Sequence, residues 1–319
     1  MKRTLILLLA SLLAATSFAQ VKKAPAPERQ GWSEYIDSSN SFITPLYGNV
    51  ESVVYTKYKL KDYFGEIVKG DLDSKVVVKF NKRGDVIEKA EYDSDGSLRR
   101  KHIYKYDSAG NMIEEAMYFS DGSLDGKDIY KYDSAGNKIE EVSYDSDGSQ
   151  AGKWICKYDS VGNMIEEAMY FSDGSLEVKY TRKYDSAGNK IERAVYNSDG
   201  LLSWKLIYKY DSAGNMIEYA HYDSDGSLMW ETIYKYDSAG NKIEEAYYGS
   251  DGSLGGKRIY KYDSAGNKIE EAMYNSYGSL DYKYTWKYDS KGNVVEEIRY
   301  KSEIMIPQYI REYKITYRE

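Results

Sequence analysis

The chain has 319 residues, including 36 Tyr, 26 Gly, 2 His and 1 Cys, and its formal net charge is −7. One Cys excludes a disulfide scaffold, which needs cysteine pairs, and one Cys with two His leaves too few ligands for a structural zinc site. Aromatic residues make up 15% of the chain, which excludes a disordered protein because disordered chains are poor in aromatics.

Residues 1–19 are predicted to be a signal peptide. Lys2 and Arg3 precede a short apolar run, and Ser17-Phe18-Ala19 forms a small-x-small cleavage site. The run is too short to span a bilayer, and the alternative, a retained anchor, lacks a stop-transfer segment. We therefore expect an exported protein, periplasmic, on the cell surface or secreted, with no membrane span after cleavage.

Two irregular regions flank the centre of the chain. Residues 20–48 contain Pro25, Pro27 and Pro45 without periodicity, which is typical of a leader or linker. Residues 49–79 are expected to form an irregular N-terminal cap, and residues 300–319 a C-terminal capping strand. Caps are expected because an unpaired sheet edge recruits other strands.

One 26-residue unit recurs through residues 80–299. Its marker is Lys-Tyr-Asp-Ser-x-Gly-Asn, whose Asp recurs without insertion from Asp107 to Asp289. A second run, such as Asp145-Ser146-Asp147-Gly148, divides each unit. Both runs suit a type I turn closed by a left-handed Gly in a bulge. About eight or nine residues remain between turns, an ordinary strand length.

The repeat predicts an all-β fold: an extended antiparallel meander of tandem β-hairpins in a twisted or coiled, largely single-layer sheet. A β-solenoid is the alternative, but tight Gly turns reverse a chain whereas solenoid corners only bend it. One face is expected to carry Ile, Lys and Glu, and the other Tyr, Ala, Glu and Lys. The expected pairs are Lys131 with Ile139, Tyr130 with Glu140, Ile129 with Glu141 and Tyr132 with Lys138.

The Tyr-x-Tyr-Asp-x-x-Gly-Asn run resembles the YD repeat of the RHS family, and more weakly the MORN-type hairpin repeats. Tyr130, Tyr132, Asp133, Gly136 and Ile139 match the family unit, whereas Asn137 stands where the family usually has Arg. The resemblance implies a β-sheet spiral with an extracytoplasmic binding role, often carbohydrate binding. The family's core segment and C-terminal toxin region are not recognised here, so the resemblance does not imply toxin delivery.

Few side chains indicate chemistry. Asp145 and Asp147 resemble the start of a calcium loop, but Cys156 stands where such a loop has Glu, so we favour a plain turn and keep the pair as the calcium candidates. Adjacent glutamates point to opposite faces of a strand and cannot flank one glycosidic bond. His102 and His221 are expected on the surface. We predict no catalytic centre and no cofactor.

Aromatic side chains are the candidate ligand contacts, because exposed rings stack on sugars or on protein partners. The alternative is that they only pack on Lys and Glu stems to hold the sheet together. We expect a non-enzymatic scaffold that binds a protein or glycan at the cell envelope, and a carbohydrate-binding module is the alternative. The acidic charge argues against nucleic acid. The candidate contacts are Trp154, Trp204, Trp230, Trp286, Tyr130 and Tyr132.

Overall fold

The computed structural model describes residues 46–64, 66–302 and 305–318, so the predicted signal peptide and most of the predicted linker lie outside the described residues. The described part of the chain contains no helix with the length and apolar character needed to cross a lipid bilayer. It contains twenty strands. They are β1 (Val50–Tyr63), β2 (Glu66–Phe80), β3 (Val86–Tyr92), β4 (Leu98–Tyr106), β5 (Met112–Phe119), β6 (Leu124–Tyr132), β7 (Lys138–Asp145), β8 (Gln150–Tyr158), β9 (Met164–Phe171), β10 (Leu176–Tyr184), β11 (Lys190–Tyr196), β12 (Leu202–Tyr210), β13 (Met216–Asp223), β14 (Leu228–Tyr236), β15 (Lys242–Gly249), β16 (Leu254–Tyr262), β17 (Lys268–Asn275), β18 (Leu280–Tyr288), β19 (Val294–Lys301) and β20 (Ile306–Tyr317).

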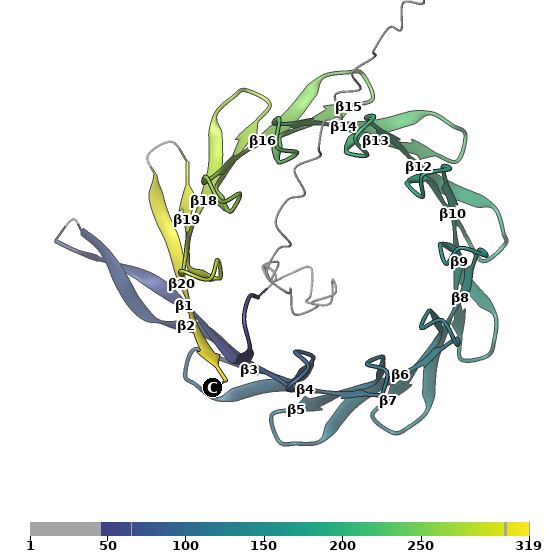
Figure 1. Ribbon diagram of the computed structural model, residues 1–319, viewed down its shortest axis with the longest axis horizontal. Coiled ribbons are helices and arrows are strands. Elements are labelled where there is room, and N and C mark those ends of the chain that lie inside the picture. The colour runs from purple at the N-terminus through teal and green to yellow at the C-terminus, as the bar shows by residue number, and fades with distance from the viewer. Residues whose placement is uncertain (1–45, 65, 303–304, 319) are drawn as a thin grey trace, which may run out of the picture.

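The strands form one closed ring (Figure 1). Each strand pairs antiparallel with the strands before and after it in the chain, and β20 pairs with β1 as well as with β19. The predicted antiparallel meander of hairpins is therefore confirmed. A parallel solenoid does not occur, because every pairing among the described strands is antiparallel.

The two predicted caps do not cover separate edges of an open sheet. Residues 49–79 supply β1 and β2, and residues 300–319 supply β20, which joins β1 at a seam with Val53 opposite Ile315 and Tyr55 opposite Tyr313. The apolar core gathers beside this seam, where buried apolar side chains of the N-terminal region pack together. It consists of Leu46, Val50, Val53, Val76, Val78 and Phe80.

The turns have the predicted geometry. In the Asp133 turn, Gly136 has φ of 85°, its N–H donates to the Asp133 carbonyl at 3.1 Å, and the Asp133 N–H donates to the Asn137 carbonyl at 2.9 Å. The Asp133 carboxylate accepts hydrogen bonds from the Asn137 backbone N–H and side-chain amide, each at 2.9 Å. Asp and Asn therefore recur because they fix the turn, and Gly recurs because it adopts positive φ without strain.

The predicted register is wrong beyond the first pair. Tyr132 does lie opposite Lys138, but Lys131 lies opposite Glu140, Tyr130 opposite Glu141 and Ile129 opposite Val142. The cause is a β-bulge that leaves Ile139 without an opposite residue. The bulge also moves the Ala and Val positions, so they share a face with Ile and Lys rather than with Tyr.

The handedness of the strands decides which face lines the ring. The Asp133 N–H and C=O bond across their turn, on the β7 side, and alternation along β6 therefore points the N–H and C=O of Tyr130 toward β5. Because the residues are L-amino acids, an observer who faces the Tyr130 side of the sheet with β6 running upward sees each following strand to the left of the one before it. In Figure 1, which is viewed from the end that carries the Asp133-type turns, the strands follow one another counter-clockwise. An observer inside the ring, with β6 running upward, therefore also sees each following strand to the left, so the Tyr130 face is the inner wall.

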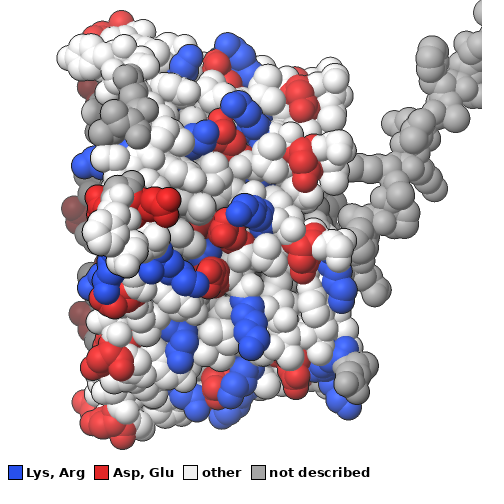
Figure 2. All heavy atoms as spheres, turned by 90° about the vertical axis from the view of Figure 1, so that its left-hand side faces the viewer, with Lys and Arg blue, Asp and Glu red and all other residues white. Residues whose placement is uncertain are grey.

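Exposure agrees with this assignment, because a concave wall crowds side chains and a convex one separates them. On the inner wall Tyr130 is 4% exposed, whereas the side chain of Lys131, on the outer face, is 65% exposed. The outer face is a ladder of ion pairs in which Glu140 contacts Lys131 and Lys153 at 2.6 Å each. Figure 2 shows basic and acidic side chains interspersed on the outer face.

Candidate functional site

The repeats differ on the inner wall and agree on the outer face. On the outer face, the positions in phase with Lys131 are all Lys and those in phase with Glu140 are all Glu, from residue 105 to residue 296. On the inner wall, the residues in phase with Trp154 are His102, Asp128, Trp154, Tyr180, Leu206, Thr232, Arg258 and Tyr284. Side chains that distinguish one copy from another therefore face the ring interior.

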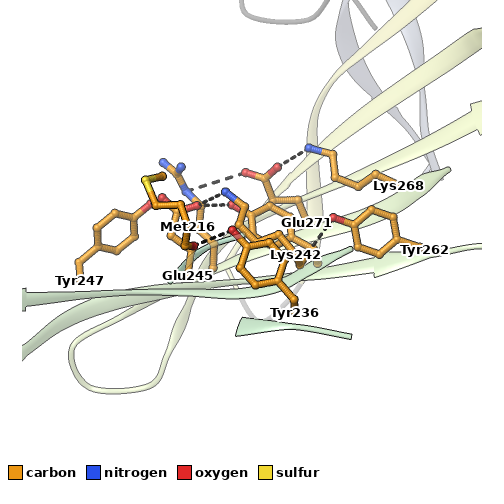
Figure 3. A network of polar contacts seen from close by, with 10 residues as sticks. Met216, Tyr236, Lys242, Glu245, Tyr247, Tyr262, Lys268 and Glu271 are labelled. Carbon is orange, nitrogen blue, oxygen red and sulfur yellow. Dashed lines mark hydrogen bonds and ion pairs between the residues drawn. The ribbon is translucent and has the colours of Figure 1, made fainter. Parts of the chain in front are cut away.

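One inner-wall tyrosine is constant, and its role is structural. Tyr132 donates its hydroxyl to the carbonyl oxygen of Met112 at 2.8 Å, which ties its hairpin to the preceding one. The copies from Tyr106 to Tyr288 repeat this bond to a carbonyl twenty residues earlier, and Figure 3 shows it for Tyr236 with Met216 and Tyr262 with Lys242. The donors are Tyr106, Tyr132, Tyr158, Tyr184, Tyr210, Tyr236, Tyr262 and Tyr288.

Inner-wall carboxylates are tied to neighbouring donors. Glu245 accepts hydrogen bonds from Lys242 at 2.8 Å and from Tyr247 and Tyr260 at 2.6 Å each (Figure 3). Burial alone would raise the pKa of Glu245, but these hydrogen bonds hold it below its usual range. Glu245 is thus an ionised, fully engaged group, and its arrangement serves packing of the wall.

A second carboxylate lies at the seam. Glu297 is fully buried and accepts hydrogen bonds from the indole N–H of Trp286, the Tyr309 hydroxyl and the Arg311 guanidinium, each at 3.1 Å. Burial raises the pKa of Glu297 above its usual range. The network joins β18, β19 and β20, which places it where the ring closes.

The structure divides the six candidate contacts into two groups. All six lie on the inner wall, but Tyr130 and Trp286 are only 4% and 5% exposed. Tyr130 lies under the Lys138 ammonium, 5.4 Å from its ring centre. Burial leaves these two side chains, and the hydrogen-bonded Tyr132, as parts of the wall. Trp154 and Trp204 are half-buried and Trp230 is 37% exposed, so these three stay candidates.

Three tryptophans belong to a row of rings that we call the aromatic band. The His221 ring lies between Trp204 and Trp230, 5.2 Å from each, and is parallel to Trp230 within 4°. Tyr219 meets Trp230 at 5.1 Å and continues the row toward Tyr208. The band comprises Trp154, Tyr180, Arg193, Trp204, Tyr208, Tyr219, His221 and Trp230, from strands β8 to β14.

The expectation that both histidines lie on the surface is wrong. The Nδ1 atom of His102 lies 2.9 Å from a Glu115 carboxylate oxygen, and the side chain is 12% exposed. His221 is held in the aromatic band, with its Nδ1 buried. The error follows from treating the sheet as wet on both faces, whereas closure makes one face concave.

The remaining candidates have local roles. The Asp147 carboxylate accepts the Ser149 backbone N–H at 2.8 Å and Asp145 accepts the Ser149 hydroxyl at 3.4 Å, so the two calcium candidates form hydrogen bonds within their own turn. No group of three or more metal-ligating side chains suited to a metal ion lies among the described residues. Cys156 occupies the position that Tyr130 has in the preceding repeat. It is buried, and burial raises the pKa of its thiol. An intermolecular disulfide at Cys156 would need local opening.

Sequence reasoning missed the neighbours of the tryptophans. Arg193 and Tyr219 occupy positions where the other copies from residue 115 onward carry Glu, and both lie in the aromatic band. The sequence did show that Arg193 and Tyr219 interrupt a position that is otherwise Glu. This interruption points to the site only after the correct register places that position on the inner wall.

No family model matches the chain, and no curated protein sequence matches it. Among solved structures it is similar to the TcdB2-TccC3-Cdc42 complex, at 12% identity and a TM-score of 0.39, with 79% of this chain and 15% of that chain covered. It is similar to the Photorhabdus luminescens Tc holotoxin pore at 14% identity and a TM-score of 0.40, covering 80% and 15%. A porin-like protein from Bacteroides uniformis shares 9% identity at a TM-score of 0.38, covering 84% and 96%.

The chain thus spans 15% of the length of the toxin chains that it matches. At these identities and TM-scores, the similarities establish no shared function. The chain is a repeat-type β-structure, and its specific assignment to the YD repeats stays a prediction.

Proposed function

We propose that the chain is an exported, non-enzymatic scaffold that binds a partner of the cell envelope on the inner wall of its ring. One observation carries the proposal: the copies share most of their outer-face residues, with exceptions such as Glu231, whereas several inner-wall positions differ from copy to copy. Uniform Lys–Glu ladders need only hold neighbouring strands together. Diversified side chains inside a concave surface are what selective contact requires.

The dimensions of the ring support an internal ligand. Twenty strands at roughly 4.8 Å per strand give a circumference of roughly 96 Å and a backbone diameter of roughly 30 Å. Side chains on opposite walls leave room for an extended chain or a saccharide. Engaged carboxylates such as Glu245 and Glu297 favour binding over catalysis, because a general acid or base must be free to exchange a proton.

A carbohydrate ligand is the second candidate. Trp230 favours it, because 37% of this residue is exposed on the inner wall and tryptophan rings stack on sugars. The two candidates share a site and differ in the chemistry of the ligand.

Binding screens with the exported chain test the proposal. Glycan and peptide arrays identify ligands, and each ligand is then measured against Trp204→Ala and Trp230→Ala. We expect about a tenfold or greater loss of affinity, typical of an aromatic contact residue. Tyr222→Ala is the matched control, because Tyr222 pairs with Lys205 on the outer face of the same hairpin. Ligands that depend on Tyr222 but not on the tryptophans would refute an inner-wall site.

A further inference from the structure

The aromatic band departs from the charge balance of the rest of the inner wall. Glu141, Glu167 and Glu245 each have a cationic partner, namely Lys138, Arg182 and Lys242. In the same phase the band carries Arg193 and Tyr219, so two acidic side chains are replaced by one cation and one neutral ring. This part of the wall is therefore more positive than its neighbours.

Arg193 is held by rings and not by a carboxylate. Its guanidinium carbon lies 4.5 Å from the Tyr180 ring centre and 5.8 Å from the Trp204 ring centre. Its Nε is buried without a hydrogen-bond partner among the described residues. Arg182 on the adjacent strand differs, because its guanidinium contacts Glu167 at 2.6 Å. The buried Nε cannot reach a ligand, but no described residue forms an ion pair or hydrogen bond with the two terminal nitrogens of Arg193, so these are the donors left for an external acceptor.

The rings of the band pack on one another. His221 is parallel to Trp230 within 4°, and Trp204 lies on the other side of His221 at a tilt of 42°, so His221 is enclosed by indoles while Trp230 has one stacked neighbour. Ring edges are electropositive, and each indole adds one N–H donor and no acceptor. An electropositive, donor-rich and apolar strip suits carboxylates carried among apolar side chains.

We propose that the aromatic band binds an acidic peptide segment, with a carboxylate on Arg193 and apolar side chains against the indole rings. This inference rests on the proposed function, because it names the ligand class of the same inner wall. Arg193 and a peptide carboxylate form a two-pronged, charge-assisted pair. Binding therefore weakens as salt increases.

The test uses fluorescence anisotropy of the exported chain with a short labelled peptide of alternating Glu and Leu. The critical variant is Arg193→Glu, which restores the residue that other repeats carry and is therefore compatible with the fold. Its matched control is Lys205→Glu, an equal charge change on the outer face, where the equivalent position of the next repeat is Glu231. We expect the Arg193 variant to weaken binding about tenfold or more, as for a hydrogen bond to a charged group, and the Lys205 variant to leave it unchanged.

Three outcomes overturn the inference. The Glu-Leu peptide does not bind, its Gln-Leu counterpart binds equally well, or Arg193→Glu binds as tightly as the unaltered chain. Polygalacturonate and neutral oligosaccharides are measured in parallel. If only a saccharide binds and Trp204→Ala abolishes it, the acidic-peptide inference fails while the inner-wall function stands. If ligands bind without dependence on any inner-wall residue, both fail.

Discussion

Tyr132 shows how one hydroxyl replaces a missing backbone donor. Pairing between β5 and β6 begins at Glu114 with Ile129, so the Met112 carbonyl lies beyond the last pair of this ladder. A carbonyl left there without a partner would carry a desolvation cost, and the Tyr132 hydroxyl satisfies it. The repeat therefore requires Tyr at this position for its oxygen as well as its ring.

Replacing Tyr132 with Phe tests this role. Tyr132→Phe keeps the ring but leaves the Met112 carbonyl unpaired, so we expect a loss of about 1 kcal/mol in the free energy of unfolding, measured by urea denaturation. Tyr144→Phe is the control, because Tyr144 lies on the outer face opposite Lys127. Equal effects of the two substitutions would show that the hydroxyl bond adds nothing.

At the scale of the hairpin, each Asp133-type turn couples stability to pH. Hydrogen bonds from the Asn137 side chain and backbone lower the pKa of Asp133 below its ordinary value. The folded state then favours the ionised carboxylate. This contribution is complete above the unfolded pKa, about 4, and is lost as the pH falls through the lower folded value.

Asp133→Asn should remove that pH dependence while keeping an oxygen acceptor in the turn. Asn occurs naturally at the start of a turn in this protein, at Asn197, where its side-chain oxygen accepts the Leu201 N–H at 2.9 Å. We expect the unaltered chain to be the more stable at neutral pH and the difference to shrink as the pH falls below about 4. Thermal midpoints across the acid range measure it, and a constant difference would contradict the assignment.

Turns and strands could be predicted from the sequence because their determinants are local. Asp133 and Gly136 identify the turn within four residues, and the spacing between turns sets strand length. The register was wrong because the Ile139 bulge depends on how two strands twist against each other. For the site, the tryptophans could be selected by type, but their neighbours Arg193 and His221 could not. Which face becomes concave is a property of the whole ring.

At the scale of the molecule, closure depends on a seam between the chain's two terminal strands. Strand β20 pairs with β1 on one side and with β19 on the other, and its Arg311 forms an ion pair with the fully buried Glu297. The contacts of the seam join residues some 240 to 270 positions apart, such as Asn293 with Tyr47 and Arg318 with Val50. No local sequence pattern predicts pairing between residues so far apart, and for this reason the two terminal regions were expected to cap separate edges of the sheet.

Removing residues 306–319 tests the seam. Truncation exposes the edges of β1 and β19, so we expect soluble oligomers or aggregates by size-exclusion chromatography with light scattering. Arg311→Met is the control, because it keeps β20 but leaves Glu297 buried without its ion-pair partner. We expect this variant to lose about 3–5 kcal/mol of stability yet remain monomeric. A monomeric truncated chain would show that β20 does not protect the edges.

Because the ring is closed, the number of repeats sets its inner diameter. Each added 26-residue unit would insert two strands, lengthening the circumference by roughly 9.6 Å and widening the bore by roughly 3 Å. The uniform outer ladder accepts a new copy at any junction, and the seam strands need not change. Duplication or loss of a unit would therefore yield a series of rings that differ stepwise in inner diameter, and hence in the size of ligand that each can enclose.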